Sequence, residues 1–213
     1  MSARLIVFDL DGTLVNSRAD LAHAANAAVT SLGRPPLPVD EVQAHIGNGS
    51  RELMRRMLGP AHQDQLDLAL AAYFACYEAN LCVHTRVYPG VDALLRALDV
   101  PAVVLTNKPG RLARPLCDAL GITARFEVVW GEGDAPARKP DPQGALSLCA
   151  RFGVAPAEAR FVGDSHVDAA TARNAAIPFI GVTWGFGTPD EMRAEGATDF
   201  ADSADDLRRM LGA

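Results

Sequence analysis

The amino-acid sequence predicts an α/β protein: a Rossmann-like, doubly wound parallel sheet that carries an inserted α-helical domain. Two observations support this fold class. Short apolar runs alternate with helical patterns from about residue 89 onward, and another apolar run, Leu5–Phe8, stands near the start. Between them, residues 39–80 contain no strand-like run. Alternating strands and helices form a parallel sheet with helices on both faces. We therefore expect an α/β core of residues 1–16 and 89–213 and a helical insert of residues 17–88.

Apolar runs and helical spacing locate the individual elements. Glycine or proline closes several of the helical patterns, as at Gly33, Gly121 and Gly153, because these residues end helices. The predicted strands are residues 5–8, 102–105, 127–130, 160–162 and 179–182. The predicted helices are residues 17–32, 39–46, 50–58, 63–79, 91–98, 111–120, 142–152, 166–176 and 204–211.

Composition narrows the class of protein. The 213 residues are 49% hydrophobic, which suits a folded domain with a sizeable core. The net charge of −6 argues against nucleic acid as the main partner. Neither a signal-peptide pattern nor an apolar run long enough to span a bilayer occurs, so we expect a cytoplasmic protein with no membrane partner. The sequence does not distinguish a monomer from a homodimer.

Two carboxylates follow the first strand. On a pleated strand, positions i and i+2 face the same way, so Asp9 and Asp11 can converge beyond the end of Leu5–Phe8. Gly12 then allows a sharp bend, and Thr13 adds a hydroxyl. Two adjacent carboxylates resist ionising together unless a cation lies between them or one keeps its proton. The structural alternative is an acidic turn.

Other predicted strands end in polar residues as well. The second strand leads into Thr106-Asn107-Lys108, and the fourth leads into Gly163-Asp164-Ser165 with Asp168 one turn later. Lys139 precedes a helix between them. Ligands of open parallel sheets bind at the carboxyl ends of strands. Singly, Thr106 could be a helix N-cap, Lys139 a solvated charge and Asp164 a turn residue; together they indicate one site.

The chemistry of this set favours phosphoryl transfer. Clustered carboxylates suit a hard cation, and Mg²⁺ held by a few carboxylates and a substrate phosphate fits. A hydroxyl, an amide and a lysine suit phosphate oxygens. The sequence has no activated cysteine or serine and no Gly-x-x-x-x-Gly-Lys-[Ser/Thr] motif, so Asp9 is the natural nucleophile, through an aspartyl-phosphate.

These residues resemble the four signature motifs of the haloacid dehalogenase-like hydrolase superfamily, in order and approximate spacing over nearly the whole chain. The helical insert resembles that superfamily's cap. The motifs are Asp9-Leu10-Asp11-Gly12-Thr13, Thr106-Asn107, Lys139-Pro140 and Gly163-Asp164-Ser165-x-x-Asp168.

The resemblance implies a role for each residue. Asp9 would attack phosphorus, and Asp11 would protonate the leaving alkoxide and then activate water. Mg²⁺ would be held by Asp9, the main-chain carbonyl of Asp11 and Asp164, with Asp168 orienting the metal site. The phosphoryl oxygens would be held by Thr106, Asn107 and Lys139.

Within the superfamily, Ile46–Gly49 and Val182–Gly187 resemble phosphoglycolate phosphatases. Two departures concern Asn16-Ser17, where Asp-Ser is commoner, and Ala176-Ile177-Pro178, which replaces the usual Ala-Gly pair. The candidate specificity residues of the cap are Gly47, Asn48, Gly49, Ser50 and Arg51. The alternative is an ordinary helix-to-helix turn with Ser50 as N-cap, and an Arg51 that lies in solvent instead of pairing with a substrate carboxylate.

We therefore expect a Mg²⁺-dependent phosphomonoester hydrolase whose partner is a small phosphorylated metabolite, with 2-phosphoglycolate as the leading substrate. Other possibilities are a phosphatase of a sugar phosphate or pyrophosphate, and a sugar phosphomutase. A 2-haloacid dehalogenase has no need for Asp11. A non-catalytic binding relative would have lost Asp9 or Asp11, and both are present.

Overall fold

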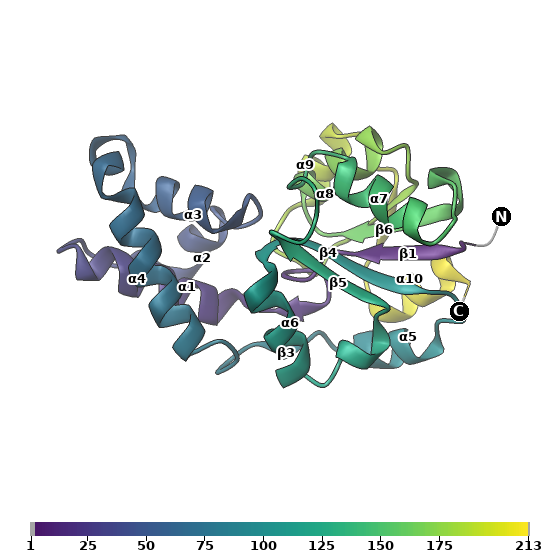
Figure 1. Ribbon diagram of the computed structural model, residues 1–213, viewed down its shortest axis with the longest axis horizontal. Helices are drawn as coiled ribbons and strands as arrows, with labels where there is room; N and C mark the ends of the chain where they lie inside the picture. Colours follow the sequence, from purple (N-terminus) through teal and green to yellow (C-terminus); the bar gives the residue numbers. More distant parts are fainter. Residues whose placement is uncertain (1–2, 213) are drawn as a thin grey trace. The chain divides into compact units, whose positions relative to one another are not determined.

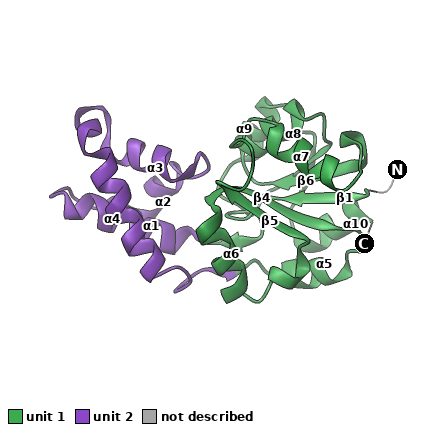
Figure 2. Ribbon diagram, in the orientation of Figure 1, with its two compact units in different colours: residues 1–16, 87–213 green, residues 17–86 purple. Residues whose placement is uncertain are grey.

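The computed structural model describes residues 3–212, which divide into two units (Figures 1 and 2). The α/β unit contains residues 3–16 and 87–212, and the helical unit contains residues 17–86. Among the described residues, no helix is both long enough and apolar enough to cross a membrane.

A six-stranded sheet forms the centre of the α/β unit, and every strand pair in it is parallel. This confirms the predicted fold class. The strand order is β5-β4-β1-β6-β7-β8. The bounds are β1 (Leu5–Phe8), β4 (Ala102–Pro109), β5 (Val128–Glu132), β6 (Ala159–Gly163), β7 (Phe179–Val182) and β8 (Asp199–Ala201).

Strand β1 lies between β4 and β6, and all four of its residues are buried. In the register of the sheet, Phe8 is opposite Val104 on one side and Val162 on the other. Each of these three residues is followed closely by a polar segment of the candidate site. Parallel register therefore brings the three segments to one edge of the sheet.

Helices cover both faces of this sheet. Leu5 and Val7 of β1 belong to an apolar cluster that includes Leu148 of α7 and Ala172 of α8. Figure 1 shows α5 and α10 on the opposite face. The helices are α5 (Val91–Ala97), α6 (Gly110–Ala119), α7 (Gln143–Arg151), α8 (His166–Asn174), α9 (Pro189–Ala194) and α10 (Ala204–Leu211), with short 3₁₀ segments η2 (Thr123–Arg125) and η3 (Pro156–Glu158).

The helical unit packs α1 against α4, with Tyr73 and Tyr77 of α4 buried. The helix predicted over residues 63–79 is divided in two, because 3₁₀ segment η1 runs to Gln65 and α4 begins only after that residue, whose φ of −94° and ψ of 2° lie outside the helical region. The bounds are α1 (Arg18–Ser31), α2 (Val39–Gln43), α3 (Gly49–Leu58), η1 (Pro60–Gln65) and α4 (Leu66–Ala79).

Several short features were not predicted. Strands β2 (Val15–Asn16) and β3 (Arg86–Val87) form a two-stranded sheet, and β8 and α9 extend the core. Strands of two or three residues are too short to produce a periodic signal, and the six residues of α9 make fewer than two helical turns. At the altered Ala-Gly pair, Ala176 takes φ +54°, the one non-glycine residue with positive φ in the described part of the chain.

Within the helical unit, Asp20 connects two segments far apart in sequence. It lies in the first turn of α1 and is 2% exposed. The backbone N–H groups of His84 and Thr85 donate to its carboxylate at 2.8–3.0 Å, and the Thr85 hydroxyl donates at 2.7 Å. A buried carboxylate without such donors would be strongly disfavoured. Asp20 therefore fastens the beginning of the unit to its end.

We predict that Asp20→Ala lowers the free energy of unfolding by about 3 kcal/mol, because it removes the partner of two buried donors on Thr85 and of the part-buried N–H of His84. Urea unfolding followed by circular dichroism measures this. The control is Asp67→Ala, which removes an exposed ion pair with Arg51 and should cost less than about 1 kcal/mol. Equal losses in the two variants would contradict the structural role given to Asp20.

Candidate active site

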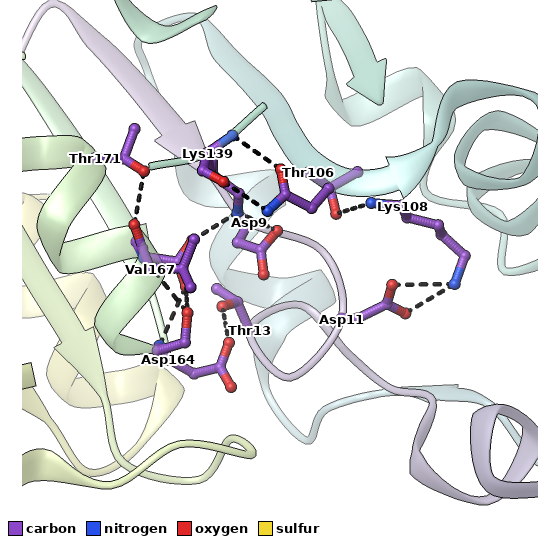
Figure 3. Close-up of polar contacts among 12 residues, drawn as sticks. Asp9, Asp11, Thr13, Thr106, Lys108, Lys139, Asp164, Val167 and Thr171 are labelled. Atoms are coloured by element: carbon purple, nitrogen blue, oxygen red, sulfur yellow. Dashed lines mark hydrogen bonds and ion pairs between the residues drawn. The ribbon is translucent and has the colours of Figure 1, made fainter. Parts of the chain in front are cut away.

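Polar side chains from the ends of three neighbouring strands meet at the carboxyl edge of the sheet (Figure 3). Asp9 follows β1, Thr106 lies in β4, and Asp164 follows β6. All are buried although they are polar, which requires that their charges and hydrogen-bonding groups be compensated locally. The buried members of the predicted set are Asp9, Thr106, Asn107, Lys139, Asp164 and Asp168.

Three carboxylates form the centre of this site. Asp9, Asp164 and Asp168 each offer an oxygen, and these atoms all lie within 4.8 Å of one another. Lys139 Nζ lies 2.7 Å from Asp9 Oδ1 and 2.6 Å from Asp168 Oδ1. The cluster therefore holds three carboxylates and one lysine, which contacts two of them, and it keeps an excess of negative charge. Oxygen ligands with this charge suit a hard divalent cation.

Burial and mutual repulsion shift the ionisation of the cluster. Burial raises the pKa of Asp9 to about 6, with Lys139 opposing the shift and Asp168 adding to it. Burial and repulsion from Asp168 raise the pKa of Asp164 to about 8. Burial works to lower the pKa of Lys139, but its carboxylate partners outweigh burial and the pKa is raised. Lys139 thus stays protonated at neutral pH.

Two loops hold Asp164 in place. The Thr13 hydroxyl donates to Asp164 Oδ1 at 2.8 Å, and the backbone N–H of Phe186 donates to Oδ2 at 2.7 Å. The backbone beside Asp164 is so close that a Cβ built on Gly12 or Gly185 would lie 2.2 Å from its side chain. Only glycine fits at these two positions. The sequence contained both loops, but nothing in it assigned them this role.

Asn107 and Lys139 hold each other through the backbone. The Asn107 side-chain amide donates to the Lys139 carbonyl at 3.0 Å, and its oxygen accepts from the Lys139 N–H at 2.9 Å. Asp168 is held by Ser165, whose hydroxyl and N–H both donate to its carboxylate at the start of α8. These contacts place Lys139 between Asp9 and Asp168.

The Asp11 carboxylate lies apart from this cluster. Both of its oxygens contact Lys108 Nζ, at 3.1 and 3.0 Å, and Figure 3 shows the side chain extending toward Lys108. Gly12, with φ +92°, turns the chain directly after Asp11. The sequence indicated that Asp9 and Asp11 share a direction, but the structure pairs them with different lysines.

The five predicted specificity residues lie together in the helical unit, where α2 is followed by α3. Gly47 and Gly49 take positive φ values of 118° and 79°, which favour glycine. Helix α3 begins at Gly49 with Asn48 as N-cap, so the alternative with Ser50 as N-cap is wrong; Ser50 is buried in the first turn. Arg51 is exposed and pairs with Asp67 at 3.1 Å.

We predict that metal-free protein loses stability as the pH rises from about 4 to about 8. Across this range the raised pKa values of Asp9 and Asp164 let the folded state bind protons that the unfolded chain has released. The free energy of unfolding therefore falls with increasing pH, and thermal unfolding in chelator measures it.

Asp164→Asn serves as the control, because it removes the group with the higher pKa and should flatten the decline. Saturating Mg²⁺ should raise the Tm of the wild type at pH 8 and raise that of the variant much less. A wild-type stability that rises over the same pH range, or an equal response of both proteins to Mg²⁺, would contradict the charge balance described for this cluster.

Comparison with known proteins agrees with this geometry. Residues 3–176 match the haloacid dehalogenase-like hydrolase family. A phosphoglycolate phosphatase from Chromobacterium violaceum is 38% identical over 200 residues, which cover 90% of both chains. One from Pseudomonas putida is 39% identical over an alignment of 217 positions, which covers 98% of this chain and 78% of the relative. The crystal structure of a predicted phosphoglycolate phosphatase from Haemophilus somnus matches with a TM-score of 0.92 and 32% identity, over 99% of this chain and 98% of that one. The chain therefore belongs to the haloacid dehalogenase-like hydrolase family.

Proposed function

We propose that this protein is a Mg²⁺-dependent phosphomonoester hydrolase that forms an aspartyl-phosphate on Asp9, with 2-phosphoglycolate as its substrate. The observation that carries the proposal is the placement of Asp9 at the end of the central strand, 2.7 Å from Lys139 and grouped with Asp164 and Asp168. The printed names of the relatives in Chromobacterium violaceum and Pseudomonas putida support the substrate.

The residues at this edge fit Mg²⁺. Asp9 and Asp164 are buried carboxylates in a cluster with excess negative charge, and the main-chain carbonyl of Asp11 would be the third protein ligand. When bound, Mg²⁺ would neutralise these carboxylates and polarise the phosphoryl group. Asp168 would act through Lys139, which it contacts at 2.6 Å.

The reaction would divide between the two aspartates. An Asp9 carboxylate oxygen attacks phosphorus and forms a new P–O bond while the bond from phosphorus to the leaving oxygen breaks. The Asp11 carboxyl donates its proton to that leaving oxygen, then accepts a proton from the water that attacks phosphorus and releases Asp9. Thr106 and Lys139 would hold the phosphoryl oxygens, and Asn107, which holds Lys139, would support them.

Substrate choice would rest partly with residues 17–88, which contain the helical unit and which we propose form a cap. Its candidate specificity residues are Gly47, Asn48, Gly49, Ser50 and Arg51. The positive φ values of Gly47 and Gly49 allow the backbone at this turn to approach a ligand closely. A cytoplasmic location and the absence of a nucleic-acid partner stay predictions from composition.

We predict that Asp9→Asn lowers turnover of p-nitrophenyl phosphate by at least about a thousandfold, because an amide cannot form the intermediate. Thermal unfolding checks that the variant is folded. The matched control is Asp190→Asn in α9, an exposed carboxylate that should leave turnover unchanged. Folded Asp9→Asn protein with more than a few per cent of wild-type turnover would overturn the assignment of the nucleophile.

We also predict that 2-phosphoglycolate has the highest kcat/KM in a screen of phosphorylated metabolites that includes sugar phosphates and pyrophosphate. The expected margin is at least about tenfold, which corresponds to about 1.4 kcal/mol of transition-state binding. A smaller margin would indicate a generalist phosphatase, and transfer of phosphate between positions of a sugar would indicate a phosphomutase.

A further inference from the structure

Lysine is used in this chain only at the candidate site. The sequence contains 20 lysine and arginine residues, and only two of them, Lys108 and Lys139, are lysines. Both side chains are buried, with 4% of each exposed. A lysine is a compact charge on a flexible stem, whereas arginine is a rigid fork. The two positions where this chain uses lysine are therefore positions where a movable point charge meets carboxylates.

The two lysines have different partners. Lys139 contacts Asp9 and Asp168, the residues grouped around the proposed nucleophile. Lys108 contacts both oxygens of Asp11, whose side chain is 12% exposed. Lys108 therefore holds a carboxylate by both of its oxygens in a nearly buried position. Lys108 thus has the geometry of a carboxylate-binding group, occupied here by a side chain of the protein itself.

Asp11 cannot stay on Lys108 and also serve as proton donor. Donation requires its carboxyl beside the leaving oxygen of an ester bound at Asp9, whereas Figure 3 shows it extended toward Lys108. Separating a buried ion pair is strongly unfavourable because it leaves desolvated charge behind. Asp11 can leave at low cost if another anion takes its place on Lys108.

We propose that Lys108 is the receptor for the substrate's own carboxylate, and this inference rests on the proposed function. The ligand class is phosphate monoesters of short α-hydroxy carboxylic acids. The backbone N–H of Lys108 donates to the hydroxyl of Thr106 at 3.2 Å, so the proposed phosphoryl-binding hydroxyl and the lysine are neighbours on β4. The substrate carboxylate replaces Asp11 on Lys108, and Asp11 turns to the leaving oxygen. Esters of neutral alcohols leave Asp11 on Lys108 and react slowly.

The kinetic test compares 2-phosphoglycolate with 2-hydroxyethyl phosphate, which replaces the carboxylate by a hydroxymethyl group. The wild type should prefer phosphoglycolate by at least about tenfold in kcat/KM, because a site built for a charged group rejects the analogue that lacks it. Lys108→Met should lose more activity on phosphoglycolate than on 2-hydroxyethyl phosphate. The ratio of the two kcat/KM values should therefore fall to about threefold or less. Lys108→Arg keeps the charge and should recover part of the ratio. Arg209→Met, which removes an exposed cation of α10, should keep the wild-type ratio.

The two lysines also allow a direct binding test that leaves Lys108 intact. In Asp9→Asn protein with ¹³C-labelled lysine side chains, Lys108→Met identifies which lysine signal belongs to Lys108. Each ester is added until the Lys139 signal stops moving, which reports occupation of the phosphate site. Phosphoglycolate should then move the Lys108 signal, and 2-hydroxyethyl phosphate should leave it in place. A Lys108 signal that does not respond to saturating phosphoglycolate would overturn the proposal.

The outcomes separate this inference from the proposed function. Wild-type protein that hydrolyses neither ester nor p-nitrophenyl phosphate would overturn both. If both proteins hydrolyse the esters, and the ratio of kcat/KM for phosphoglycolate to that for 2-hydroxyethyl phosphate is the same in the wild type and in Lys108→Met, only the role of Lys108 would be overturned. Equal losses on all three esters in Lys108→Met would assign Lys108 a structural role and would also overturn it.

Discussion

The site depends on one electrostatic constraint: three carboxylates are buried together at the edge of a sheet, and Lys139 lies between two of them. Without that lysine, burial and repulsion would drive the carboxylates to bind protons or to separate. The surrounding structure serves to hold this arrangement. Asn107 fixes the backbone of Lys139, Ser165 fixes Asp168, and the loops at Thr13 and Phe186 fix Asp164. The excess of negative charge that remains suits a divalent cation.

The sequence predicted the sheet well because its central strands β1 and β4 are buried on both faces and begin as continuous apolar runs. The strand predicted at residues 179–182 has the observed bounds. Strand β8 was not predicted because Asp199–Ala201 is only three residues long, and α9 was not predicted because Pro189–Ala194 makes less than two turns. The division of residues 63–79 into η1 and α4 depends on the backbone of one residue, Gln65 (φ −94°, ψ 2°), which periodicity does not reveal.

For the site, too, the sequence predicted which residues share an edge of the sheet but not which side chains contact one another. Parallel topology brings strand ends together, so Asp9, Thr106 and Asp164 could be grouped from sequence alone. Side-chain partners are a different matter. That Asp11 contacts Lys108, and that Phe186 donates to Asp164, depends on rotamers and on loop paths across more than 20 residues of sequence. Sequence spacing shows which residues can share an edge, whereas the choice of partner among them is made by packing in three dimensions.

The Asp20 carboxylate has a consequence for how such a protein can diversify. It ties His84 and Thr85 to the start of α1, so some 64 residues of helical chain begin and end at a single fastening point. Everything between those ends can lengthen, shorten or be replaced without altering the register of any strand in the sheet. A unit inserted in this way can change the surface that recognises a ligand, while the residues at the edge of the sheet, and with them the phosphoryl chemistry, stay the same.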